Sequence, residues 1–157
     1  MCIRILFPRF ITAYISGACA LATCFSVNGA TPGATWIANG ATACEKFLTP
    51  EVVAATLPMP AGAAARLDAN SCHTGNIYIS LKIMSVDTFR RQLPLIAGTH
   101  PLAGVGDAAY WNGACAVSAV KGQDRGCDIN VLAGAKIRDE ALGQNLGEIC
   151  SKLFALP

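Results

Sequence analysis

The segment from Asn76 to Met84 alternates apolar and polar residues without a break. Its apolar positions are Ile77, Ile79, Leu81 and Ile83, and the positions between them are Tyr78, Ser80 and Lys82. Because successive side chains of a strand point to opposite faces, this pattern predicts a half-buried β-strand with the isoleucines and Leu81 inside. Half-buried strands are typical of antiparallel sheets, so other elements must cover the apolar face.

Three more strands are predicted further along the chain. A short one at 108–111 follows a glycine-containing loop, and strands at 114–120 and 127–133 form a hairpin around the turn 121–126. The glycines of that turn can supply the positive φ that a tight loop needs.

Helices are predicted at 49–57, 85–93 and 137–154, where start signals precede an apolar stripe of helical period. Ser85 is the expected N-cap of the second helix, and Pro94 ends it. The order helix, strand, helix, three strands, helix lacks βαβ alternation, which predicts an α+β fold. We expect a two-layer sandwich stabilised by disulfides, in which helices pack on one face of an antiparallel sheet.

The first thirty residues have the features of an export signal. Arg4 and Arg9 precede the uncharged run Phe10 to Val27, and small residues follow at 28–30. The run contains several hydroxyl, glycine and cysteine residues, so it is too weakly apolar for a membrane span. We therefore expect residues 1–30 to be a cleaved signal peptide and the protein to be periplasmic or secreted.

The remainder is expected to hold a flexible leader at 31–43, which has no sustained period, and a single α+β domain at 44–157. An alternative for the N-terminus is a lipoprotein, because Leu21-Ala22-Thr23-Cys24 is similar to a lipobox whose cysteine is acylated. Membrane association is expected only in that case.

The charge balance argues against nucleic acid as a partner. The chain has 12 Lys and Arg and 10 Asp and Glu residues. Arg4 and Arg9 belong to the signal and every acidic residue follows it, so the exported part is close to neutral. A nucleic-acid binder needs a basic cluster that neutralises phosphates, and none is present in the sequence.

Five of the eight cysteines follow the signal, namely Cys44, Cys72, Cys115, Cys127 and Cys150. Their spacing matches no zinc or haem pattern, so no metal or cofactor is expected. In an exported chain the spacing favours disulfides instead.

The predicted elements suggest a pairing. The last helix must return antiparallel over the hairpin, where its travel of ~20 Å brings Cys150 level with Cys127. A bridge between Cys115 and Cys127 is not expected, because the residue opposite Cys115 lies at least four positions, or ~13 Å, from Cys127. We predict Cys127 with Cys150 and Cys44 with Cys72, which leaves Cys115 as a free thiol. The competing pairing is Cys115 with Cys150.

Two stretches carry a resemblance to a known group. The run Ala43-Cys44-Glu45-Lys46-Phe47-Leu48-Thr49-Pro50-Glu51-Val52 resembles the A-C-x-x-L-T-x-x-E-V opening of a family of small exported bacterial proteins, many of them lipoproteins, with Leu48-Thr49 one position later than in that pattern. The run Gly104-Val105-Gly106-Asp107-Ala108-Ala109-Tyr110-Trp111 is similar to the G-x-G-D-x-A-x-W of that group. The resemblance implies an envelope domain of unassigned function, with no catalytic residues. The chain departs from the group in its three later cysteines and in the threonine before Cys24.

No stretch of the sequence has a catalytic signature. We therefore expect a non-catalytic domain that binds an unknown protein or small molecule in the cell envelope. The alternative is a small secreted hydrolase that uses His100, Asp107 and Cys115, since a nucleophile and its base need only be close in space.

Overall fold

The computed structural model of the chain describes residues 31–49, 51, 65–75, 77–96, 98–131, 137 and 139–157. The predicted export signal, Cys24 and the helix predicted beyond Glu51 lie outside these residues. The described elements are, in order, α1 (Pro32–Phe47), β1 (Ala65–Arg66), β2 (Ser71–Thr74), β3 (Ile77–Lys82), α3 (Val86–Gln92), the 3-10 helix η1 (Leu93–Leu95), β4 (His100–Pro101), β5 (Ala108–Trp111), β6 (Ala116–Lys121), β7 (Arg125–Val131) and α4 (Glu140–Phe154).

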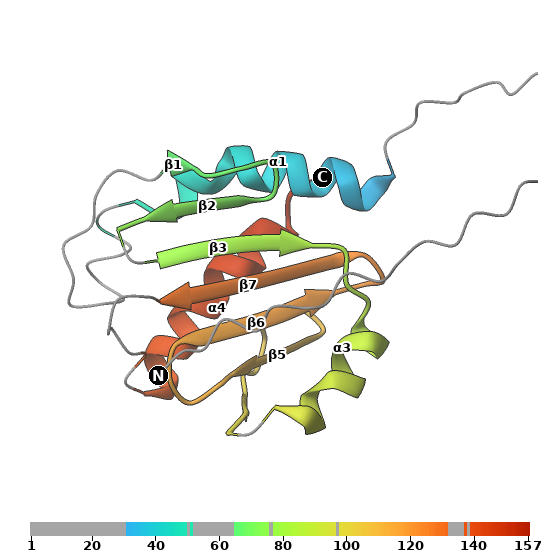
Figure 1. Cartoon of the computed structure of the whole chain (residues 1–157), viewed down its shortest axis with the longest axis vertical. Coiled ribbons are helices and arrows are strands. Elements are labelled where there is room, and N and C mark those ends of the chain that lie inside the picture. The colour runs from blue at the N-terminus through green and yellow to red at the C-terminus, as the bar shows by residue number, and fades with distance from the viewer. Residues whose placement is uncertain are drawn as a thin grey trace, which may run out of the picture.

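The strands form a seven-stranded sheet in the order β1-β2-β3-β7-β6-β5-β4 (Figure 1). Every neighbouring pair is antiparallel, which confirms the α+β class and the antiparallel sheet. The predicted strand at 76–84 is β3, with Ile77, Ile79 and Leu81 each 1% exposed. Ile83 was expected on the same buried face but is 58% exposed, because the strand ends at Lys82.

The predicted hairpin is formed by β6 and β7. Lys121 lies opposite Arg125, so the turn is shorter than the six residues expected, and Gly122 takes a φ of +65° within it. Ala119 pairs with Cys127 and Val117 with Ile129. This register places the apolar residues of both strands on one face, as their alternation predicts.

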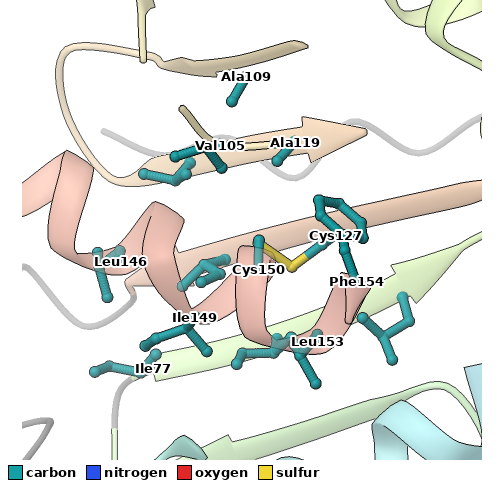
Figure 2. Packing of buried hydrophobic residues seen from close by; sticks show 14 of the residues in the cluster. Ile77, Val105, Ala109, Ala119, Cys127, Leu146, Ile149, Cys150, Leu153 and Phe154 are labelled. Carbon is teal, nitrogen blue, oxygen red and sulfur yellow. A yellow bond between two sulfur atoms is a disulfide. The ribbon is translucent and has the colours of Figure 1, made fainter. Parts of the chain in front are cut away.

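Helix α4 covers that face. Asp139 caps its first turn by accepting a hydrogen bond from the Leu142 amide. Figure 2 shows Leu146, Ile149 and Leu153 of α4 among the buried side chains of the sheet. The predicted bridge between Cys127 and Cys150 is present, with an S–S distance of 2.05 Å and a Cα–Cα distance of 5.8 Å.

The expectation of a flexible leader at 31–43 is wrong, because these residues form most of α1. Trp36 is fully buried, and its indole Nε1 donates to the Leu153 carbonyl at 2.8 Å. Gly40 allows the helix to approach β3, since a Cβ there would lie 2.4 Å from Leu81 Cδ1. The buried side of α1 therefore contains small residues, whose weak hydropathy gives little periodic signal. The folded unit begins before Cys44.

The expectation that all helices pack on one face is also wrong. Helix α3 begins at the predicted cap, where Ser85 Oγ accepts a hydrogen bond from the Thr88 amide. Phe89 of this helix packs with Tyr110 and Val120. These two residues alternate with residues that face α4, so α3 lies on the opposite face, over β5 and β6. At β5 and β6 both faces of the sheet carry apolar residues, so α4 covers one face and α3 covers the other.

Candidate functional site

On the sheet face opposite α1 and α4, five neighbouring strands each contribute one polar side chain to a single line. These residues are Ser71 on β2, Ser80 on β3, Asp128 on β7, Ser118 on β6 and Tyr110 on β5. The strand registers place each of them directly opposite the next. Residues paired in this way have Cβ atoms ~4.5–5.5 Å apart, so the five form a continuous strip of hydroxyl and carboxylate groups. We call this strip the polar row.

Asp128 is the charged member of the polar row. Its Oδ2 accepts a hydrogen bond from Lys82 Nζ, and the two groups form an ion pair. Its Oδ1 is buried and has no hydrogen-bond partner among the described residues. Leaving a buried polar atom unpaired costs about 1–3 kcal/mol. One carboxylate oxygen of the row therefore has unused hydrogen-bonding capacity.

Two further buried polar atoms on this face lack a partner within the described part of the chain. Ser71 is 9% exposed and its Oγ makes no hydrogen bond. His73 lies two residues along β2, so it points to the same face, and its Nδ1 is likewise unpaired. Two more unpaired buried atoms in the described part of the chain, Trp111 Nε1 and Ser151 Oγ, lie on the side of the sheet that α4 covers.

A second line lies beside the polar row. His73 pairs with Tyr78 and Tyr78 with Asn130 across β2, β3 and β7. The His73 and Tyr78 rings stack with centroids 5.4 Å apart and an interplanar angle of 18°. Tyr78 and Asn130 are half-buried. This second row adds a ring surface and an amide next to the hydroxyls.

At the other end of the polar row, Tyr110 lies between the sheet and α3, with its ring centroid 5.4 Å from that of Phe89. Burial raises the pKa of Tyr110, and the negative charge of Asp128 raises it further, although a hydrogen bond with Ser118 acts in the opposite direction. The phenol therefore stays protonated at neutral pH and keeps a proton to donate.

The three residues of the hydrolase alternative do not form a catalytic group. Cys115 is in a disulfide, so its sulfur cannot serve as a nucleophile. Asp107 Oδ2 accepts a hydrogen bond from the Gly122 amide at 2.8 Å. His100 lies opposite Trp111, four residues from Asp107, which is ~13 Å at the rise of a strand.

Cys115 was expected to be a free thiol, whereas in the structure it is in a disulfide whose partner lies outside the described residues. Cys72, like Cys115, is in a disulfide. The two cannot bond to each other, because Cys72 lies on β2 and Cys115 precedes β6, with β3 and β7 between those strands. The pairing of Cys72 with Cys44 stays a prediction, since the Cys44 side chain lies outside the described residues.

The loop Gly104-Val105-Gly106-Asp107 has a structural role. Gly106 takes a φ of +58°, and a Cβ there would lie 2.4 Å from the Val120 carbonyl oxygen. The Asp107 amide donates to that same carbonyl, while its carboxylate accepts from Gly122 in the β6–β7 turn. The motif thus fastens β5 to the hairpin, which agrees with its interpretation as a turn that leads into a strand.

No group of three or more potential metal ligands occurs within the described part of the chain. The described helices include none that is long and apolar enough to cross a membrane. Comparison with protein-family models, with curated proteins and with solved structures finds no match. The resemblance to small exported bacterial proteins therefore stays a prediction.

The sequence shows which residues of β3 and β7 contribute polar side chains to this site. Tyr78, Ser80 and Lys82 are the polar positions of the alternating strand, and Asp128 alternates with buried residues in β7. Solvent exposure is the ordinary interpretation of such positions. Their meeting on neighbouring strands follows from the pairing of β3 with β7, which are more than forty residues apart.

Proposed function

We propose that this chain is an exported bacterial envelope protein, periplasmic or secreted, that binds a partner molecule on its polar sheet face without converting it chemically. The N-terminal sequence supports export, and the Cys127–Cys150 disulfide is compatible with an extracellular or periplasmic location.

The observation that carries the binding proposal is the set of partly exposed polar side chains that meet on β3 and β7 of this face. Tyr78 lies opposite Asn130 and Ser80 opposite Asp128, and all four are half-buried. Lys82, also half-buried, forms an ion pair with Asp128. These neighbouring side chains offer a ring, a hydroxyl, an amide and a paired charge to a molecule that binds at the surface.

The chemistry of the same face supports a non-catalytic role. Nucleophilic catalysis needs a nucleophile within hydrogen-bond reach of a base that a third group orients. On this face the carboxylate of Asp128 is paired with Lys82, while the histidine ring of His73 stacks on Tyr78 in the second row. These pairings leave neither group in the role of a base that activates a nucleophile.

Binding is tested by immobilising the disulfide-bonded exported protein and exposing it to an envelope extract. The comparison uses the face variant Ser80→Ala with Asn130→Ala and a control with two exposed hydroxyls removed from α1, Thr35→Ala with Thr42→Ala. Mass spectrometry and glycan analysis identify the retained molecules. We expect the wild type and the control to retain the same species and the face variant to lose them.

Two results would overturn the binding proposal. Retention that is equal in the face variant would place binding elsewhere on the protein. Conversion of a retained molecule by the wild type, lost in the face variant, would make the protein an enzyme.

Export is tested separately by intact mass of the protein purified from the envelope, with and without reduction and alkylation. A chain that starts near residue 30 supports a soluble exported protein, whereas a chain that starts at Cys24 with added acyl groups supports the lipoprotein alternative. A protein whose Cys127 and Cys150 react with the alkylating reagent before reduction contradicts the proposed oxidising compartment.

A further inference from the structure

We propose that Asn112-Gly113 is a self-modification site, at which the side-chain amide of Asn112 is converted to a carboxylate by spontaneous deamidation. The two residues lie in the turn that joins β5 to β6. This inference is independent of the proposed function, because it concerns a reaction of the chain with itself and with water.

The reaction joins two neighbouring residues. The Gly113 amide nitrogen forms a bond to Asn112 Cγ, the Cγ–Nδ2 bond breaks, and ammonia leaves with the proton that the Gly113 nitrogen gives up. Water then opens the resulting five-membered imide at one of its two C–N bonds, which gives aspartate or isoaspartate. In sum, one water is consumed and one ammonia is released.

The nucleophile of this reaction is accessible. Gly113 is exposed, has no side chain and takes a φ of +72°. Its amide makes no hydrogen bond among the described residues, so ring closure breaks none there. The same exposure admits the water that opens the imide.

Three backbone amides surround the oxygen on which negative charge develops. Asn112 Oδ1 accepts hydrogen bonds from the N–H groups of Ala114, Cys115 and Ala116 at 3.1, 2.9 and 2.9 Å. When the Gly113 nitrogen adds to Cγ, Oδ1 becomes an oxyanion. Preorganised amide donors aimed at developing charge stabilise the transition state. The turn therefore supplies an oxyanion hole to its own side chain.

His100 lies beside the same turn and can take the proton of the Gly113 amide. A Cβ at Gly113 would lie 3.3 Å from His100 Nε2. The His100 ring packs on Trp111 with centroids 4.9 Å apart, which holds it next to the turn. A histidine positioned at a proton that is transferred serves as a general base. Nucleophile, base and oxyanion donors thus meet at one exposed turn.

Asn39-Gly40 is a second Asn-Gly step in the described part of the chain, and its surroundings differ. It lies inside α1, where the Gly40 amide belongs to the helical hydrogen-bond ladder. Asn39 Nδ2 donates to the Pro157 carbonyl at 2.9 Å, which holds the leaving amide in place. Because the dipeptide is the same, a difference in rate between the two steps reports the local structure.

The two products have different consequences for the turn. Aspartate keeps an oxygen at the position of Oδ1, so the three amides stay paired. Isoaspartate adds one carbon to the backbone next to the Asn112 amide, which donates to the Ala116 carbonyl at 3.0 Å. Deamidation therefore preserves the turn in one product and lengthens it in the other.

The test is peptide mapping by mass spectrometry of the exported protein, incubated with its disulfides intact at mildly alkaline pH and reduced before digestion. Enzymatic methylation identifies isoaspartate. We expect Asn112 to react about tenfold faster than Asn39, and about tenfold faster than the same residue in a synthetic peptide of residues 109–116. A rate at Asn112 that does not exceed that of the peptide would overturn the proposal.

His100→Phe tests the base. Phenylalanine keeps a ring over Trp111 but has no nitrogen, so deamidation of Asn112 should slow about tenfold. Loss of packing alone would loosen the turn and would not slow the reaction. Thr99→Ala, in the same loop, is the matched control and should react at the wild-type rate. An unchanged rate in His100→Phe, or equal slowing in both variants, would contradict the role of His100.

Discussion

The two faces of the sheet are made by the same strands, yet one face is apolar and the other carries a line of polar side chains. On the face covered by α1 and α4, Val117, Ala119, Cys127 and Ile129 are 0% exposed and fill one apolar cluster. On the opposite face, the polar atoms of Ser71 and Asp128 are buried without a hydrogen-bond partner among the described residues. The covered face supplies the apolar core, and the opposite face presents the partly exposed polar side chains of Ser80, Asp128 and Asn130.

The largest expected effect comes from opening a cavity in the covered face. Ile129→Ala should lower the free energy of unfolding by about 2–5 kcal/mol, because Ile129 is fully buried at the centre of the apolar cluster. Asn130→Ala, the next residue on the opposite face, should change it by less than about 0.5 kcal/mol. Urea denaturation measures both changes. Equal losses of stability would contradict the assignment of the stabilising core to the covered face.

The next effect tests the covalent link on the covered face. Replacing both Cys127 and Cys150 by alanine should destabilise the protein by about 3 kcal/mol, since the bridge closes a loop with a sequence separation of 23. Thermal and denaturant unfolding of the double variant give the value. Unchanged stability would show that the bridge does not constrain the unfolded chain.

A smaller effect of opposite sign is expected on the polar face. Ser71→Ala should raise the free energy of unfolding by about 1 kcal/mol in the absence of ligand, because it removes a buried hydroxyl that has no described partner. Destabilisation by Ser71→Ala without ligand would mean that the hydroxyl is satisfied in the folded protein.

The smallest effect concerns alkaline pH. The pKa of Tyr110 is raised in the folded state, chiefly by burial, so the folded protein holds this proton more tightly than the unfolded chain does. The associated stability is present below the unfolded pKa of about 10 and is lost as the pH rises through the folded pKa. Unfolding measured from pH 8 to 11 should therefore show a steeper loss for the wild type than for Tyr110→Phe. Parallel profiles would contradict the shift.

Local patterns predicted much of the covered face. The alternation in β3 identified its buried residues, and the apolar positions of β6 and β7 gave the face that these two strands share, although not the length of their turn. The position of Cys150 along the last helix was sufficient to predict its bridge to Cys127. These predictions succeeded because strand and helix periods depend only on nearby residues.

The wrong predictions have two physical causes, namely burial of residues with little hydropathy and contacts between distant segments of the chain. Helix α1 was missed because its buried side includes Gly33 and Gly40, which pack closely but carry little hydropathy. The disulfide at Cys115 and the packing of α3 on the second face depend on where distant parts of the chain meet. Local propensity carries no information about such meetings.

The sequence by itself determined the class of the fold, the inner side of each main strand and the near-neutral charge of the chain after residue 30. The tertiary structure alone decided that Ser71, Ser80, Asp128, Ser118 and Tyr110 form one row, because the row exists only in the strand order β2-β3-β7-β6-β5. Alternation states which side of a strand is polar. Pairing between strands distant in sequence is set by the burial of the whole apolar face, and this pairing gathers the polar residues into a site.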